Sequence, residues 1–301
     1  MTRCSRDTKL IVMGVLVLVN PRAGFRRDRV GISRRIASLF PQGEVAVEVP
    51  ESKGELRARA EEAAARGVRL VVAVGGDGTV REVAGALLDT ESVLGILPLG
   101  SGNGLSRGLG IGVSQSRALR VLAEGKDRAI DVGILNGEPF FNLSGIGFDA
   151  VVGKEFDRSP FRGFLPYFGI AARESLQYRR VEVSLRLPGR EIIARVFLIT
   201  VANLSQFGAG AIIAPQADPA DGLLDIVVIR KLSAFELLLY APKLFDGSVQ
   251  ELSNLETYRS RAFRIVRAQK GPVHLDGEPF RFGHVLDYSV LPGALRVRVP
   301  A

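Results

Sequence analysis

Residues 75–79, Gly-Gly-Asp-Gly-Thr, are the part of this sequence whose residue types and spacing best suit chemistry. They follow the apolar segment 70–74 and precede a segment with apolar residues at helical spacing, so they predict a turn from a strand into a helix. Glycines at such a turn let the backbone approach a phosphate, and the first helical turn presents unpaired N–H groups. Asp77 would repel a bare phosphate, so it indicates a bridging divalent cation or a role in proton transfer. A tight turn with Asp77 as helix cap is the alternative that needs no ligand.

A second glycine-rich turn, residues 98–105, follows the next predicted strand at residues 94–97. Asn20-Pro21 follows the predicted strand Val15–Val19, although alone it would ordinarily be only a turn. Because the carboxyl ends of parallel strands meet at one sheet edge, where ligands of open α/β sheets bind, these turns predict a polyphosphate site. The sequence contains neither the P-loop pattern nor G-x-G-x-x-G. These absences disfavour a P-loop nucleotide-binding domain and a dinucleotide-binding Rossmann domain.

The elements that position these turns alternate between apolar strands and helical segments up to about residue 90, which predicts a parallel sheet with helices on its faces. Beyond Asp131 the pattern changes to short alternating strands, with helical stretches around residues 161–178 and 235–245. We therefore predict a three-layer α/β nucleotide-binding domain over residues 1–130 and an antiparallel β-sandwich-like domain over residues 131–301. The active site is expected in the cleft between them.

Composition narrows the partners and the compartment. The 301 residues hold 40 Lys and Arg against 32 Asp and Glu, a net charge of +8, which favours anionic partners. Basic residues are spread through the helices and no known DNA or RNA module occurs, so nucleic-acid binding is disfavoured. Cys4 is the single cysteine, which excludes an intrachain disulfide and cysteine-rich zinc sites and indicates a reducing compartment. No membrane-spanning segment is predicted, and the cytoplasm is the expected location.

Six motifs in chain order carry a resemblance to a known family. They are Asn20-Pro21 with Gly24, the run 75–79 followed by Glu82, the run 98–103, Asp131-Val132-Gly133 with residues 141–149, residues 203–225, and Asp276-Gly277-Glu278. In these motifs the sequence resembles the diacylglycerol kinase catalytic family, which includes sphingosine, ceramide and bacterial lipid kinases. The run 75–79 alone is less specific, because NAD kinases and phosphofructokinases share it.

The resemblance implies phosphorylation of a lipid hydroxyl with ATP and Mg²⁺ as cofactors. It implies that Glu278 is the general base and that Asp77 and Asp131 organise Mg²⁺ or its waters. It places the following residues at the nucleotide: Asn20, Gly75, Gly76, Asp77, Gly78, Thr79, Gly100, Ser101, Gly102 and Asn103. In-line phosphoryl transfer agrees with this assignment, since it needs charge neutralisation and a carboxylate near the attacking hydroxyl.

Some bacterial relatives hold a second, structural Mg²⁺ at the Asp-Gly-x-Leu-Asp loop. Here the resemblance points to Asp221, with the carbonyls of Asp218 and Leu223, as its ligands. An all-oxygen ligand set suits a hard cation. The alternative is an Asp-Gly turn between strands that needs no metal.

Two departures leave the acceptor and the activity open. Gly104 replaces an aspartate that many bacterial diacylglycerol kinases carry, and the run Gly-Ser-Gly-Asn is closer to sphingosine and ceramide kinases. Pro50 stands where relatives often place a nucleotide-contacting threonine, and it has no side-chain donor. A kinase of NAD or another soluble alcohol, and a catalytically inactive lipid-binding protein of the same fold, are therefore the alternatives.

A membrane lipid substrate requires reversible docking at a membrane. Residues 158–168 mix aromatic side chains with arginines and are followed by Arg173, Arg179 and Arg180, a composition that suits a transient contact with an anionic surface. A helix whose aromatics fill the edge of the sandwich is the alternative. We expect a cytoplasmic enzyme, peripheral to the inner membrane face, and leave open whether it is a homodimer.

Overall fold

The N-terminal part of the chain alternates strands and helices, as its sequence pattern predicts. The computed structural model describes residues 14–21, 29–148, 173, 178, 180–208, 210–233, 236 and 242–301. The N-terminal elements are β1 (Val15–Val19), α1 (Arg29–Ala37), β2 (Val45–Glu48), α2 (Lys53–Ala65), β3 (Leu70–Gly75), α3 (Asp77–Ala86), β4 (Val93–Pro98), α4 (Gly104–Gly108) and α5 (Gln115–Glu124).

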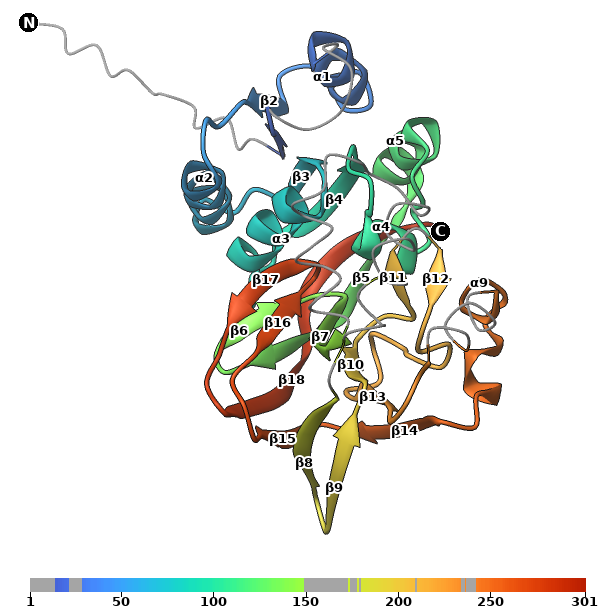
Figure 1. The fold of residues 1–301 in the computed structure, drawn as a ribbon. Coiled ribbons are helices and arrows are strands. Elements are labelled where there is room, and N and C mark those ends of the chain that lie inside the picture. Colours follow the sequence, from blue (N-terminus) through green and yellow to red (C-terminus); the bar gives the residue numbers. More distant parts are fainter. Residues whose placement is uncertain are drawn as a thin grey trace, which may run out of the picture.

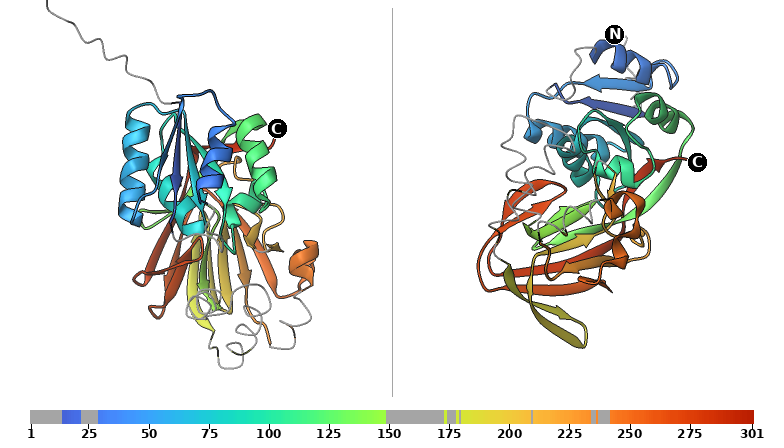
Figure 2. Two further views of the ribbon diagram at one scale, coloured as in Figure 1. Left: turned by 90° about the horizontal axis from the view of Figure 1, so that it is seen from above. Right: turned by 45° about the vertical axis from the view of Figure 1, so that its right-hand side comes forward.

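A parallel sheet in the order β2-β1-β3-β4 forms the centre of this part. Strands β1, β3 and β4 are buried along their whole length, which explains why they are continuous apolar runs instead of alternating ones. Helices α2 and α3 cover one face of the sheet and α1 and α5 cover the other (Figure 2). The predicted three-layer arrangement is confirmed.

Local signals set the ends of α2. The Ser52 hydroxyl accepts a hydrogen bond from the Glu55 amide at 3.1 Å and caps the first turn. Gly67, just beyond the helix, has a φ of +72°, a conformation that glycine adopts without strain. Lys53 is therefore the first residue of a helix whose first turn is capped.

The C-terminal part consists mainly of antiparallel strands. They are β5 (Lys126–Leu135), β6 (Glu138–Phe140), β7 (Leu143–Gly147), β8 (Val181–Leu187), β9 (Arg190–Val196), β10 (Leu198–Ala202), β11 (Gln206–Gly208), β12 (Ala211–Ile212), β13 (Leu224–Ile229), β14 (Leu255–Ser260), β15 (Ala262–Arg267), β16 (Pro272–Leu275), β17 (Glu278–Arg281) and β18 (Val285–Val299). The helix α9 (Lys243–Asp246) and a 3₁₀ turn, Ser248–Glu251, precede β14. Most of the two predicted helical stretches lies outside the described residues.

The last strand joins the two parts of the molecule. β18 pairs in parallel with β4 and in antiparallel with β5, so the parallel sheet continues through β18 into β15, β8 and β9 (Figure 1). A second, six-stranded sheet runs β14-β13-β10-β7-β16-β17. Apolar side chains of both sheets form a core between them, including Ile265 and Tyr288 of the first sheet and Ile199 and Ile226 of the second. The predicted fold class is confirmed, whereas the division at residue 130 stays a prediction.

Candidate active site

The two glycine-rich turns lie directly against each other. The Leu99 amide donates to the Gly75 carbonyl at 2.7 Å, and a methyl group on Gly100 would lie 2.7 Å from the Cα of Gly76. A side chain on Gly100 would break this backbone contact, and one on Gly76, at 3.1 Å from the Cα of Gly100, would crowd it. The turns after β3 and β4 therefore form one surface, with the amino end of α3 behind it.

Asp77 joins these two turns. Its Oδ2 accepts a hydrogen bond from the Asn103 amide at 2.8 Å and its Oδ1 accepts one from the Gly104 amide at 2.7 Å. Burial raises the pKa of Asp77, and these two backbone hydrogen bonds act in the opposite direction. The side chain of Asp77 thus holds the second glycine-rich turn against the start of α3.

Gly104 explains one departure from the family pattern. A side chain at this position would collide with the side-chain amide of Asn142, which donates at 3.0 Å to the Gln206 carbonyl. An aspartate cannot be accommodated at position 104 without displacing Asn142. What this position supplies is its backbone N–H, which binds Asp77.

Polar side chains of the predicted nucleotide set shape the turns. Asn103 has a left-handed backbone (φ 51°), and its side chain binds both the amide and the carbonyl of Gly100, at 3.0 and 2.7 Å. Asn20 donates to the Thr79 hydroxyl at 2.7 Å and so links the turn after β1 to α3. Ser101 is exposed at the tip of the second turn. The predicted residues that follow β1, β3 and β4 are therefore brought together.

Glu278 reaches the same place from the C-terminal part of the chain. A methyl group on Gly78 would lie 2.7 Å from its Oε1 and 3.4 Å from the Nζ of Lys53. Lys53 forms an ion pair with Oε1, and the Nη1 of Arg81 lies 3.5 Å from Oε2. Glu278 is 28% exposed, so its carboxylate lies at an accessible surface of the glycine turn.

Asp276 fixes the hairpin that carries Glu278. Its buried carboxylate accepts backbone hydrogen bonds from Phe141, Asn142 and Leu143, at 2.9, 2.7 and 3.2 Å. Asp276 and Gly277 both have positive φ, 52° and 87°, as the tight turn between β16 and β17 requires. Burial raises the pKa of Asp276, and the amide hydrogen bonds lower it in part. The carboxylate therefore ties β17 to the segment between β6 and β7.

Arg81 was not among the residues predicted for the site, yet it connects α3 to this hairpin. Its guanidinium lies 4.8 Å from the ring centroid of Phe280 and donates to the Pro139 carbonyl at 3.2 Å. Its Nε lies 4.0 Å from Asp276, and the side chain is only 11% exposed. Arg81 thus holds the carboxylate of Glu278 against the glycine turn. Lys53 was also missed, because nothing local in the sequence links it to a residue 225 positions away.

Comparisons with known proteins agree with this geometry. The chain matches the family described as diacylglycerol kinase catalytic domain over residues 14–135 and the one described as YegS C-terminal NAD kinase beta sandwich-like domain over residues 143–299. It is 32% identical over 291 residues to "Probable lipid kinase YegS-like" of Pseudomonas aeruginosa, covering 95% of this chain and 94% of that protein. It is 30% identical over 295 residues to "Diacylglycerol kinase" of Mycobacterium tuberculosis, covering 95% of each.

The chain belongs to the diacylglycerol kinase family. It is accordingly a kinase, a phosphotransferase with an alcohol acceptor. Two solved structures share its fold. A diacylglycerol kinase from Bacillus anthracis superposes with a TM-score of 0.74 at 22% identity, covering 95% of this chain and 97% of that one. An NAD kinase from Archaeoglobus fulgidus in complex with ATP reaches a TM-score of 0.54 at 14% identity, covering 94% and 93%.

Asp131 of this kinase has its hydrogen-bond partners outside the glycine turns. Its Oδ1 accepts a hydrogen bond from the Gly293 amide at 2.8 Å, and its Oδ2 accepts one from the Gly222 amide at 2.6 Å. The residue is only 3% exposed. No hydrogen bond or ion pair joins it to Asp77 or Glu278 among the described residues. These contacts brace β5 against β18 and the loop before β13, and they favour a structural role over the predicted role at Mg²⁺.

In the loop before β13, the carboxylates of the predicted structural Mg²⁺ site have other partners. The guanidinium of Arg259 pairs with Asp221 and lies 3.4 Å from the buried Asp225. Asp218 forms an ion pair with Arg128 at 2.9 Å. The Asp221 carboxylate also accepts a hydrogen bond from the Leu223 amide at 2.9 Å. Within the described residues Arg259 thus supplies a counter-charge to Asp221, and the predicted Mg²⁺ ligands stay a prediction.

No cluster of three acidic, histidine or cysteine side chains that could hold a metal ion occurs in the described part of the chain.

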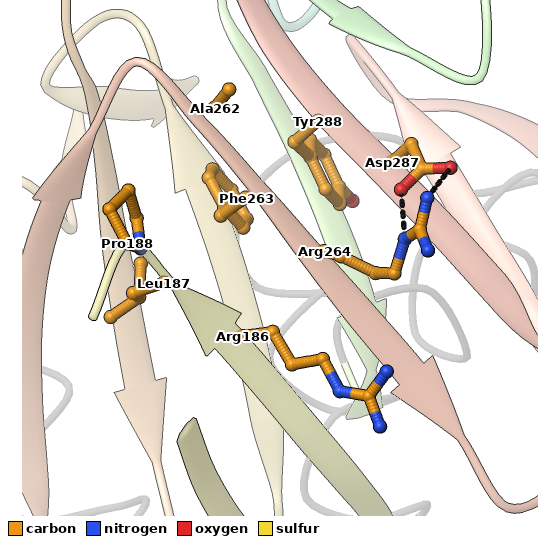
Figure 3. Close-up of a pocket in the computed structure, with 8 residues that line it drawn as sticks. All are labelled: Arg186, Leu187, Pro188, Ala262, Phe263, Arg264, Asp287 and Tyr288. Atoms are coloured by element: carbon orange, nitrogen blue, oxygen red, sulfur yellow. Dashed lines mark hydrogen bonds and ion pairs between the residues drawn. The ribbon is translucent and has the colours of Figure 1, made fainter. Parts of the chain in front are cut away.

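A pocket lies elsewhere on the kinase, where β8, β15 and β18 meet (Figure 3). Phe263 and Tyr288 form its floor with stacked rings, and Arg264 pairs with Asp287 at its margin. Arg186 also lines it. It contains none of the residues predicted for the site.

In the described parts of the chain, no helix combines the length and the apolar character needed to cross a membrane.

Proposed function

We propose that this kinase transfers the terminal phosphate of ATP, bound with Mg²⁺, to a hydroxyl group of a membrane lipid. The observation that carries the proposal is the approach of Glu278 to Gly78, which brings a carboxylate to the turn best suited to phosphate. The relatives named lipid kinase and diacylglycerol kinase support a lipid acceptor.

The nucleotide phosphates would lie on the glycine turn at residues 75–79. The backbone N–H groups at the start of α3 and the positive end of its dipole would bind their charge. Thr79 and Asn20 would hold the shape of the turn through their hydrogen bond, and Asp77 would hold it against the second turn. Mg²⁺ would supply further neutralisation of the charge on the transferred group.

Glu278 would act as the general base. Its accessible carboxylate can accept the proton of the lipid hydroxyl while the hydroxyl oxygen attacks the terminal phosphorus. The bond from this phosphorus to the bridging oxygen breaks in the same step, and ADP leaves. Arg81 would keep this carboxylate in place, because its own guanidinium is fixed by Phe280 and Pro139. The retained carboxylate at Gly78 favours an active kinase over an inactive lipid-binding protein.

One assay tests the acceptor class. The protein is incubated with γ-labelled ATP, Mg²⁺ and, separately, diacylglycerol, ceramide, sphingosine, phosphatidylglycerol or NAD. Label in a lipid supports the proposal, and label in NADP would instead support a kinase of a soluble alcohol. Absence of label from every acceptor, with lipid still bound, would contradict it.

Replacing the base gives the largest expected effect. Glu278→Gln should lower the turnover number by about 10² to 10⁴-fold, the usual contribution of a positioned general base, without weakening ATP binding. Glu256→Gln is the matched control, since Glu256 is also a partly exposed carboxylate paired with an arginine, Arg230, at 2.6 Å. Unchanged turnover in Glu278→Gln would remove Glu278 from the role of base.

The proposed docking of the kinase at a membrane rests on the amino-acid sequence. The aromatic and basic segment at residues 158–168 lies outside the described residues. We propose that the kinase meets its lipid at an anionic membrane surface, as its net charge of +8 favours. Sedimentation with vesicles that contain phosphatidylglycerol, compared with phosphatidylcholine alone, tests this, and equal binding to both would contradict it.

A further inference from the structure

The glycine turn has no cationic side chain of its own, and Lys53 supplies one from α2. Residues 75–79 contain no lysine or arginine. The Nζ of Lys53 lies 3.4 Å from the point where a Cβ on Gly78 would stand, and it is ion-paired with Glu278. The Lys53 side chain is 60% exposed. A phosphate bound at Gly78 on the Glu278 side would therefore lie within reach of this ammonium group.

The two cations around Glu278 are held very differently. Arg81 is mostly buried, lies over the ring of Phe280 and donates to the Pro139 carbonyl, so its guanidinium cannot move without losing these contacts. Lys53 extends from the first residue of α2, and Glu278 is the partner of its ammonium group. Exposed ion pairs of this kind are weak, whereas a terminal phosphate carries more charge than one carboxylate. Lys53 can therefore exchange its partner, and Arg81 cannot.

We propose that Lys53 binds the terminal phosphate of the nucleotide and that it holds the carboxylate of Glu278 until the nucleotide arrives. This inference rests on the proposed function. Binding of the nucleotide moves the ammonium group from Glu278 to the phosphate. The Oε1 atom that Lys53 held is then free to accept the proton of the attacking hydroxyl, while Arg81 keeps its contact with Oε2. Lysine suits the exchange because its ammonium is a compact charge on a flexible chain.

Calorimetric titration of the full chain with ATP and with AMP, in the presence of Mg²⁺, tests the proposal. Lys53→Met should weaken ATP binding about tenfold or more, the effect of losing one contact to a charged group, and leave AMP binding unchanged. Arg57→Met is the matched control, because Arg57 lies one turn along the same helix and pairs with Glu61 at 2.9 Å. The Arg57→Met variant should bind ATP and AMP as the wild type does. The Lys53→Arg variant should bind ATP more tightly than Lys53→Met and less tightly than the wild type.

The partner exchange makes a second, sharper expectation. Glu278→Gln should tighten ATP binding severalfold, because Lys53 no longer has to leave a carboxylate, and this gain should vanish when Lys53→Met is also present. The inference is overturned if Lys53→Met binds ATP as tightly as the wild type, or weakens ATP and AMP equally. If the wild type binds neither nucleotide, the proposed function itself fails. Thermal melting of each variant confirms that the fold is intact.

Discussion

The glycine turn at residues 75–79 and the loop at residues 218–225 both present aspartates beside glycines, but they neutralise them differently. At the glycine turn, Asp77 is satisfied by two backbone amides, and the remaining carboxylate, Glu278, is paired with an exposed lysine on one oxygen and with the buried Arg81 on the other. At the other loop, the guanidinium of Arg259 contacts both Asp221 and Asp225. An exposed lysine can change partners, whereas an arginine between two carboxylates is a fixed counter-charge. The two loops therefore differ in how readily their charged groups can exchange partners.

The largest effect that would sharpen this comparison is expected from Gly78→Ala. The new methyl group would displace Glu278, because it would lie 2.7 Å from Oε1. Since small displacements of a reacting group are costly, we expect turnover to fall about 10²-fold. The free energy of unfolding should change little, because the neighbours are flexible side-chain ends.

Gly85→Ala is the matched control within α3. At Gly85 a Cβ would meet only the end of the Arg57 side chain, at 3.7 Å. Turnover should be unchanged, and stability should rise by up to about 1 kcal/mol, the helix propensity gained over glycine. Equal losses of turnover in the two variants would show that Gly78 has no special relation to Glu278.

A smaller effect, on stability, is expected at the second loop. Arg259→Met would leave Asp225, which is 2% exposed, without its counter-charge. We expect the free energy of unfolding to fall by about 1–3 kcal/mol at neutral pH, the cost of a buried group left unpaired. The control is Arg264→Met, whose pair with Asp287 is exposed on both sides and should matter less.

The pH dependence of this variant has a defined sign. Burial already raises the pKa of Asp225 above its ordinary value of 3.8, and Arg259 opposes that rise. Without the guanidinium the folded-state pKa rises further, so stability is lost as pH increases from 3.8 through the raised pKa. The difference between wild type and Arg259→Met in urea unfolding should therefore be smaller at pH 4 than at pH 7. A constant difference would contradict the assignment.

The smallest effect is expected from metal removal. Because an arginine neutralises the loop at residues 218–225, EDTA should leave the melting temperature of the nucleotide-free kinase unchanged. A Mg²⁺-dependent rise in melting temperature that disappears in Asp221→Asn would break the comparison, since it would show that the loop takes a cation after all.

Much of the fold could be predicted because its signals are local. The buried parallel strands are continuous apolar runs, the glycine turns follow them directly, and Gly67 ends α2 with a positive φ. The joining of the halves by β18 could not be predicted, since nothing in a single strand names the partner with which it pairs. The same limit applies to Asp131, whose carboxylate finds the amides of Gly222 and Gly293.

The order of strands and helices, the turns suited to phosphate and the set of carboxylates from which a base could come can all be recognised in the sequence alone. These features depend on residues close together in the chain, where periodicity and backbone freedom act. Only the tertiary structure decided that Glu278 meets Gly78, that Lys53 and Arg81 flank it, and that Arg259 neutralises Asp221. Such pairings join residues up to 225 positions apart, and they arise from the packing of whole sheets and helices, which no local pattern encodes.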